Sequence, residues 1–168
     1  MNTKELKKIL KAHQVYLKTN DTVYQANLAG VDLTGANLFG VDLSGANLFG
    51  ANLSGVDLKF ANLTNAMLID ANLRGADLFK AKLVGAKLTN AYLTDAKLGE
   101  VNFTGANLEG ADLTGADLFG AYLIGVNLKN ANLTGVDLRN GLMKNSNQED
   151  AIFLGANLKG AYFENNTI

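Results

Sequence analysis

The stretch ANLFGVDLSGANLFGANLSG, residues 36–55, contains four near-copies of one five-residue phrase. Each phrase has a small apolar residue, Asn or Asp, Leu, a variable residue and Gly. A period of five fits neither a helix, which repeats every ~3.6 residues, nor a strand, which repeats every ~2. Within a phrase, the Leu and the small residue share one side of an extended segment, and the Asn or Asp points the other way. The stretch therefore predicts tiny strands separated by corners.

The phase of this repeat holds along most of the chain. Leu stands at the centre of every phrase from Leu28 to Leu138, with Phe103 as the only substitution, and the same phase continues to Ile168. Such self-similarity is typical of a solenoid, in which each unit buries its apolar side by stacking on its neighbours. The chain has 18 Gly and no Pro, which suits a fold that needs its backbone N–H groups for bonds between coils.

The phrase resembles the A(D/N)LXX signature of the pentapeptide-repeat family, which ANLSG, ADLTG and VDLTG match over roughly residues 21–168. Members with long tandem repeats and no attached domain are often cyanobacterial. The resemblance implies an all-β solenoid, a right-handed quadrilateral parallel β-helix with four phrases to a coil. At twenty residues per coil, the chain would form about seven coils. No shift in composition divides residues 21–168, so we expect one domain there.

The last residue of each phrase supports this period. Most phrases end in Gly, Asn or Asp, which tolerate a positive φ at a corner. Inside the regular run the exceptions are Phe60, Lys80 and Glu100, which lie twenty residues apart. They would stack in one column of a four-phrase coil. We expect that column to turn its corner without a positive φ.

Residues 1–20 differ in kind and are expected to form a short N-terminal capping helix. Leu6, Ile9, Leu10, His13 and Leu17 fall at helical spacing, and the lysines lie largely off this stripe. The stripe would cover the first coil, which otherwise exposes unpaired strand edges. A signal peptide is disfavoured because charges interrupt every apolar run. The remaining alternative is a helix that lies on a membrane surface.

The C-terminal part departs from the regular pattern. The segment GLMKNSNQED, residues 141–150, places polar residues at inward positions. Because ten residues equal two phrases, we expect a bulge there that makes one irregular coil and rejoins the register. No second helix follows, and apolar residues crowd the final coil. They form our candidate end for weak self-association as a homodimer: Phe153, Tyr162, Phe163 and Ile168.

Few side chains could carry chemistry. Without Cys, the chain has no disulfide, thiol nucleophile or Cys-based zinc site. The single His13 has no second His with which to bind a metal, and we expect it to be packed or at the boundary of the apolar stripe. Stacked aspartates such as Asp57 and Asp77 could bind a cation or act as an acid–base pair, but Asp is a regular letter of the repeat and Lys97 interrupts the column. We predict no enzyme activity, catalytic residue, metal or cofactor.

A candidate interaction face lies where outward residues break the repeat most often. Phe recurs there every forty residues, beside acidic residues on the twenty-residue grid. Clustered exposed aromatics mark partner surfaces, although stacked rings could instead shield the hydrogen bonds between coils. The candidate interaction face comprises Phe39, Asp57, Lys59, Phe60, Asp77, Phe79, Lys80, Lys97, Glu100, Asp117 and Phe119.

The sequence favours a non-enzymatic repeat scaffold or interaction module whose partner is another protein. The resemblance implies an alternative, because some family members mimic DNA, bind type II topoisomerases and protect gyrase. That mechanism needs a sustained negative field, whereas the net charge here is −1. Direct nucleic-acid binding is not expected. No membrane span or signal peptide is recognised, so the expected compartment is the cytoplasm.

Overall fold

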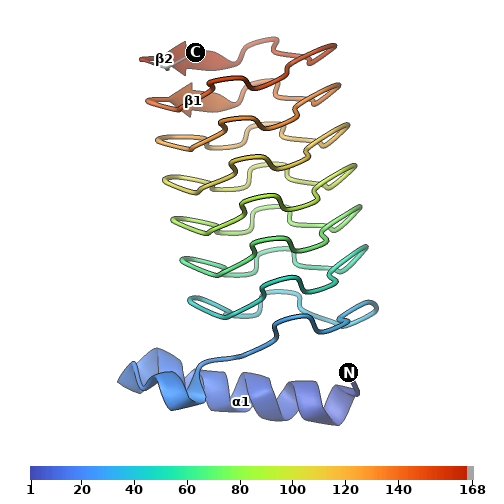
Figure 1. Cartoon of the computed structure of the whole chain (residues 1–168), viewed down its shortest axis with the longest axis vertical. Helices are drawn as coiled ribbons and strands as arrows, with labels where there is room; N and C mark the ends of the chain where they lie inside the picture. Colours follow the sequence, from blue (N-terminus) through green and yellow to red (C-terminus); the bar gives the residue numbers. More distant parts are fainter. Residues whose placement is uncertain (166–168) are drawn as a thin grey trace.

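The computed structural model describes residues 1–165, which form a rod of stacked coils with one helix across its N-terminal end (Figure 1). The helix α1 spans Thr3–Thr19, and a short 3-10 turn, η1 at Thr22–Tyr24, leads into the coils. The Asn2 side chain accepts a hydrogen bond from the Glu5 N–H, and the Glu5 carboxylate accepts one from the Asn2 N–H. This reciprocal capping box satisfies two N–H groups that would otherwise lack partners at the helix start. Among the described residues, no helix has the length and apolar character of a membrane span.

Each coil has four sides, one for each phrase. Asn27 forms a parallel bridge with Asn47, and the next three phrases bridge in the same way to residues twenty positions later. The same register continues to the bridge between Asp137 and Asn157. The twenty-residue period expected from the sequence is therefore the register of the structure.

Most phrases contribute a single bridging residue to the contact between coils. We expected a small strand in each phrase, so the regular pairing is shorter than predicted. The Leu28 N–H donates to the Asn47 carbonyl, but the Leu28 carbonyl accepts from Val31 within the corner. Because each corner uses this carbonyl, the ladder between coils is interrupted once per phrase. Within residues 1–165, strands form only at β1 (Leu142–Lys144) and β2 (Tyr162–Glu164), which pair in parallel.

Our prediction of a bulge at residues 141–150 is wrong. Leu142 and Asn147 bridge to Tyr122 and Asn127 in the ordinary register. Ser146 stands where the repeat has a small apolar residue, and it is buried with its hydroxyl donating to the Leu123 carbonyl at 2.6 Å. A bonded hydroxyl costs far less to bury than an unpaired one, so the coil keeps its path.

The interior is one continuous apolar column. Every phrase centre from Leu28 to Leu138 is buried, including Phe103, and the small Ala and Val residues beside them fill the remaining space. Each buried Leu or Phe contributes roughly 1.5–3 kcal/mol relative to exposure. The repeated contact between coils therefore holds the rod together.

The corner column of Phe60, Lys80 and Glu100 does adopt a positive φ, of 60°, 58° and 53° respectively, so our expectation for it is wrong. The N–H of each residue donates to a carbonyl of the next coil; for Glu100, this acceptor is Phe119 at 2.8 Å. These bonds fix the same corner geometry that the glycines adopt elsewhere. A left-handed conformation costs an ordinary side chain roughly 1–2 kcal/mol, which the surrounding ladder offsets.

Helix α1 packs its apolar stripe against the first coil. Leu6 and His13 are buried, with Ile9 and Leu10 partly buried beside them. The Ala26 N–H donates to Nδ1 of His13 at 3.0 Å. This bond assigns the imidazole proton to Nε2, and burial lowers the pKa of His13, although the nearby carboxylate of Asp42 opposes the shift.

Candidate interaction face

The register places the aspartates of the candidate interaction face and Lys97 in one column. Successive parallel bridges join Asp57 to Asp77, Asp77 to Lys97 and Lys97 to Asp117. Our prediction that these residues share one side therefore agrees with the coil register. The face runs along the rod, and each step in the column is one coil.

The aspartates of this column have a structural role that our sequence analysis missed. The Oδ1 atoms of Asp57, Asp77 and Asp117 accept hydrogen bonds from the N–H groups of Lys59, Phe79 and Phe119 at 3.0–3.2 Å. Such Asx turns pre-shape the corner that follows. The same bond recurs at many Asn and Asp residues in the second position of the phrase, as at Asn62 and Asn102. The frequent Asn or Asp at the second position of the phrase was the available signal.

Lysine and arginine side chains pair with three carboxylates of this column, those of Asp57, Asp77 and Asp137. The Lys59 ammonium lies 3.2 Å from Asp57 and 3.8 Å from Asp77, where a bound cation would have to sit. Farther along, a hydrogen bond from Arg139 lowers the pKa of the Asp137 carboxyl. Among residues 1–165, no group of three or more His, Cys, Asp or Glu side chains could hold a metal.

Three aromatic rings form a continuous ladder on this face. The centroids of Phe39 and Phe60 are 5.5 Å apart, and those of Phe60 and Phe79 are 6.1 Å apart, both in edge-to-face arrangements. Such pairs stabilise by roughly 0.5–1.5 kcal/mol beyond their buried area. Phe119, predicted as part of the series, lies apart and has the Arg139 guanidinium 5.7 Å from its centroid. In the structure, the corner residue Phe60 thus takes part in the ladder, and Phe119 does not.

Gly99 explains why Phe79 differs from the other two rings. Gly99 is buried, and a Cβ atom on it would lie 3.1 Å from Cδ2 of Phe79. Phe79 is half-buried over this glycine, whereas 56% of Phe39 and 49% of Phe60 remain exposed. The ring of Phe79 therefore lies over Gly99 of the next coil. A glycine at the variable position of its phrase was the signal for this contact.

The remaining charges of the face form a separate group. Lys80 pairs with Glu100 at 3.3 Å, and its ammonium lies 5.1 Å from the Phe79 centroid. Lys97 is exposed and forms no ion pair within residues 1–165. Exposed ion pairs contribute only about 0–1 kcal/mol each. These charges border the aromatic ladder without adding much to the stability of the fold.

The candidate self-association end is more apolar than predicted. Phe153 is half-buried, whereas Tyr162 and Phe163 are exposed. Ile168 lies outside the described residues. Our prediction missed three exposed apolar residues of the same coil: Ile152, Leu154 and Leu158. Apolar letters at the outward second and fourth positions of the phrase were the signal for Ile152 and Leu154.

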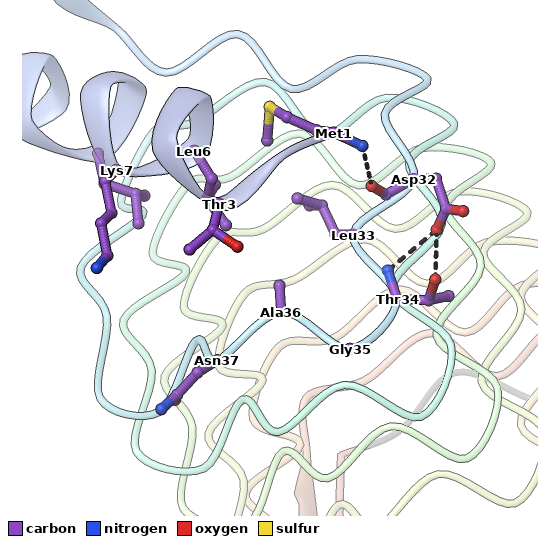
Figure 2. A pocket seen from close by; sticks show the side chains of 11 residues that line it. Met1, Thr3, Leu6, Lys7, Asp32, Leu33, Thr34, Gly35, Ala36 and Asn37 are labelled. Atoms are coloured by element: carbon purple, nitrogen blue, oxygen red, sulfur yellow. Dashed lines mark hydrogen bonds between the residues drawn. The ribbon is translucent and has the colours of Figure 1, made fainter.

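A pocket lies between α1 and the first coil, at the opposite end of the rod (Figure 2). Leu6 and Leu10 of the helix line it together with Leu33 of the coil. The Met1 ammonium donates to the Asp32 carbonyl at 3.3 Å beside it. Because both elements share the lining, the pocket reflects how the helix crosses the coil, and we assign it no ligand.

The parallel four-sided coils and their apolar interior define a class of proteins, the quadrilateral β-helices. A family model for pentapeptide repeats matches residues 24–55, 57–95, 96–135 and 131–165, in eight copies. The chain therefore belongs to the pentapeptide-repeat family, whose members fold as right-handed quadrilateral β-helices. Such proteins are generally non-enzymatic scaffolds or interaction modules.

Several solved structures resemble this chain. HetL from the cyanobacterium Nostoc sp. strain PCC 7120, involved in heterocyst differentiation regulation, is 33% identical, with 82% of this chain and 72% of HetL covered and a TM-score of 0.48. A pentapeptide-repeat protein of the Arabidopsis thaliana thylakoid lumen is 37% identical over 61% of this chain and 68% of its own, with a TM-score of 0.42. QnrB1, a plasmid-mediated fluoroquinolone resistance protein, is 20% identical over 84% and 88%, with a TM-score of 0.30. A comparison with curated proteins finds no match.

Proposed function

We propose that this protein is a non-enzymatic scaffold, a rod of about seven coils, that binds another protein through the aromatic ladder of its candidate interaction face. The observation that carries the proposal is the exposure of about half of Phe39 and Phe60 in a contiguous edge-to-face arrangement. Exposure of large apolar rings to water is unfavourable, and a partner that covers them gains the free energy of burying that area.

The backbone under the ladder favours binding. Phe60 N–H donates to the Phe79 carbonyl at 3.0 Å, and neighbouring coils repeat this bond. The rings are thus presented from a backbone that is ordered before any partner arrives. Pre-organisation of this kind lowers the entropic cost of association. The charged pairs around the rings would form a polar rim, as in many protein interfaces.

The test compares two Phe→Ser variants in partner capture. Replacing both Phe39 and Phe60 by Ser should abolish binding of a partner identified with the wild-type chain and confirmed with purified proteins. Phe49 is also 45% exposed but lies two phrases away, on another side, so Phe49→Ser is the matched control. The double variant should unfold at a lower midpoint than Phe49→Ser, because it removes two edge-to-face pairs, but both variants should stay folded under the conditions of capture. A partner retained by the Phe39 and Phe60 double variant would refute the proposal.

The alternative of DNA mimicry and gyrase protection needs a row of unpaired carboxylates. On this face, Lys59 and Lys80 instead pair with Asp57, Asp77 and Glu100. The direct measurement is gyrase inhibition by the purified chain. Salt-sensitive binding to gyrase that survives the Phe39 and Phe60 substitutions would favour the alternative.

We also propose weak homodimerisation through the C-terminal end. The argument is the exposure of 74% of Leu154, 54% of Tyr162 and 41% of Phe163 on a coil that no further described coil covers. Sedimentation at rising concentration should show a dimer in the wild-type chain and less dimer in Leu154→Ser. A strict monomer at hundreds of micromolar would exclude this surface.

A further inference from the structure

Helix α1 carries a second face that the coils do not use. Its buried stripe includes Leu6 and His13, and the opposite side carries a row of residues at the alternating spacing of four and three that keeps side chains on one helix face. All members of this row are exposed. We call it the lysine ridge, and it consists of Lys4, Lys8, Lys11, Val15 and Lys18.

The charge of the chain is distributed unevenly. Helix α1 carries five lysines and one glutamate, whereas the rest of the chain carries ten basic and fifteen acidic side chains. Within residues 1–165, no lysine of α1 forms an ion pair, although lysines on the coils do. Although the net charge of the chain is near zero, the helix α1 is basic and the rest of the chain is acidic. The basic helix attracts anions whose approach the rest of the chain would oppose.

The position of α1 turns the ridge into the end surface of the rod. The helix lies across the stack of coils, so its axis runs along the end of the rod (Figure 1). Its apolar stripe packs on the first coil, so the ridge on the opposite side points away from the coils. At about 1.5 Å per residue, the ridge from Lys4 to Lys18 is on the order of 21 Å long. A straight charged row on a blunt end is suited to a planar partner.

We propose that the lysine ridge binds the anionic headgroups of a lipid bilayer and holds the rod upright on the membrane surface. Clusters of lysines on an amphipathic helix recognise acidic lipids through charge. Val15, within the ridge, is 39% exposed, and a shallow recess on the same helix is lined by Met1, Glu5, Lys8, Ile9 and Ala12. The exposed side chains of Val15 and Met1 can contact the headgroup layer, whereas the buried stripe of the helix cannot insert.

A nucleic acid fits the ridge less well. The major groove is about 12 Å wide, enough for a free helix, but α1 is packed against the first coil through Leu6, Ile9 and Leu10. Helix α1 has no Arg, the residue that pairs with phosphate and guanine in a two-bonded geometry. An exposed Val15 would contribute nothing to phosphate binding. The acidic coils would also repel the flanking phosphates of a long duplex.

The expected binding is weak, reversible and sensitive to salt. A lysine near an anionic bilayer strengthens binding by roughly fivefold at physiological ionic strength. Because the apolar stripe of α1 stays buried against the coil, insertion cannot supplement this attraction in the way it does for a free amphipathic helix. Added salt shortens the range of the attraction and should release the protein.

The test is co-sedimentation of the full chain with vesicles of phosphatidylcholine containing roughly 30% phosphatidylserine, against vesicles of phosphatidylcholine alone. We expect binding only to the anionic vesicles, and release when salt is raised from about 0.1 M to 0.5 M. Replacing Lys4, Lys8, Lys11 and Lys18 by Gln should weaken binding by roughly a hundredfold or more. Gln is a good helix former, so thermal unfolding should change little.

A matched control removes the same number of charges from the coils. Lys82, Lys87, Lys97 and Lys159 are exposed and have no ion pair within residues 1–165, so their replacement by Gln should change vesicle binding less than threefold, by the weak effect of distant screened charges. Equal loss in both variants would overturn the proposal. So would absence of binding to anionic vesicles, or tighter binding of a short DNA duplex than of vesicles.

Discussion

The two ends of the rod differ in how the apolar side of the terminal coil is covered. At the N-terminal end, α1 covers the first coil, buries Leu6 and places His13 against the Ala26 N–H. At the other end of the described chain, Leu154 and Tyr162 are largely exposed. The phrase is the same along the whole rod, yet it supplies no cover for a terminal coil. A solenoid repeat specifies its own continuation, and an end requires a different kind of segment.

The strongest test of this comparison sets the middle of the rod against its C-terminal end. Leu78 and Leu158 occupy the same interior column, but Leu78 is fully buried and Leu158 is 38% exposed. Leu78→Ala should lower the free energy of unfolding by about 2–5 kcal/mol, because coils on both sides hold the cavity open. Leu158→Ala should cost less than half as much. Equal losses in denaturant unfolding would show that the last coil is covered.

The next test compares the two ends directly. Leu6→Ala removes a buried contact between α1 and the first coil, and we expect a loss of about 2–3 kcal/mol. Leu154→Ser changes a residue that is 74% exposed and should alter stability by less than about 0.5 kcal/mol. Denaturant midpoints of both variants measure the difference. A large loss for Leu154→Ser would place an unseen contact at the C-terminal end.

Acid should weaken the covered end through His13. Burial lowers the pKa of His13 in the folded chain, so the unfolded chain binds more protons once the pH falls through about 6.5. Stability is therefore fully present above this pH and decreases below it, until the pH reaches the lowered folded value. Protonation of Nδ1 would also remove the bond that this atom accepts from the Ala26 N–H.

Unfolding free energies at about pH 8 and about pH 5.5 check this expectation. The control is His13→Gln, which has no titrating group and should show a smaller decrease over this interval. Carboxylates that face the site, such as Asp42, should contribute little there, because the bonds from Ser44 lower the pKa of Asp42 even though its burial acts in the opposite direction. A decrease of the same size in His13→Gln would assign the pH dependence to other groups.

The smallest effect is expected for an outward hydroxyl at mid-rod. Thr114 donates to Asp112 at 2.6 Å and accepts from Asn132 at 3.0 Å. Thr114→Ser keeps the hydroxyl and removes one methyl group, so it should cost less than about 0.5 kcal/mol. The denaturant midpoint should stay close to that of the wild type. A loss comparable to Leu78→Ala would contradict the assignment of inward and outward positions.

The sequence predicted those features that the repeat imposes everywhere. The unbroken phase from Leu28 to Leu138 was enough to assign the interior column and the twenty-residue register, because stacking leaves only one side of each phrase for the core. The helical spacing of Leu6 and His13 was enough to predict which stripe of the N-terminal helix is buried.

The errors came from judging residues without their neighbours in adjacent coils. Phe60 disfavours a positive φ by itself, but its N–H bond to the next coil imposes one. Ser146 suggested a bulge, but a carbonyl of the preceding coil accepts its hydroxyl. Gly99 matters for the ring of Phe79, twenty residues away, rather than for its own backbone. The candidate interaction face depended most on such contacts, so its aromatic ladder was only partly predicted.

The register of twenty also sets the unit in which this gene can lengthen or shorten. Deletion of residues 81–100 would join Lys80 to Val101 in phase, shorten the rod by about 4.8 Å and leave every later residue on its own side. Deletion of only five residues would keep the core pattern but turn every later phrase by a quarter of the coil. The column of Tyr122, Leu142 and Tyr162 would then move to a neighbouring side. The length of the rod and the pattern of residues on its sides can thus change separately, through deletions of twenty or of five residues.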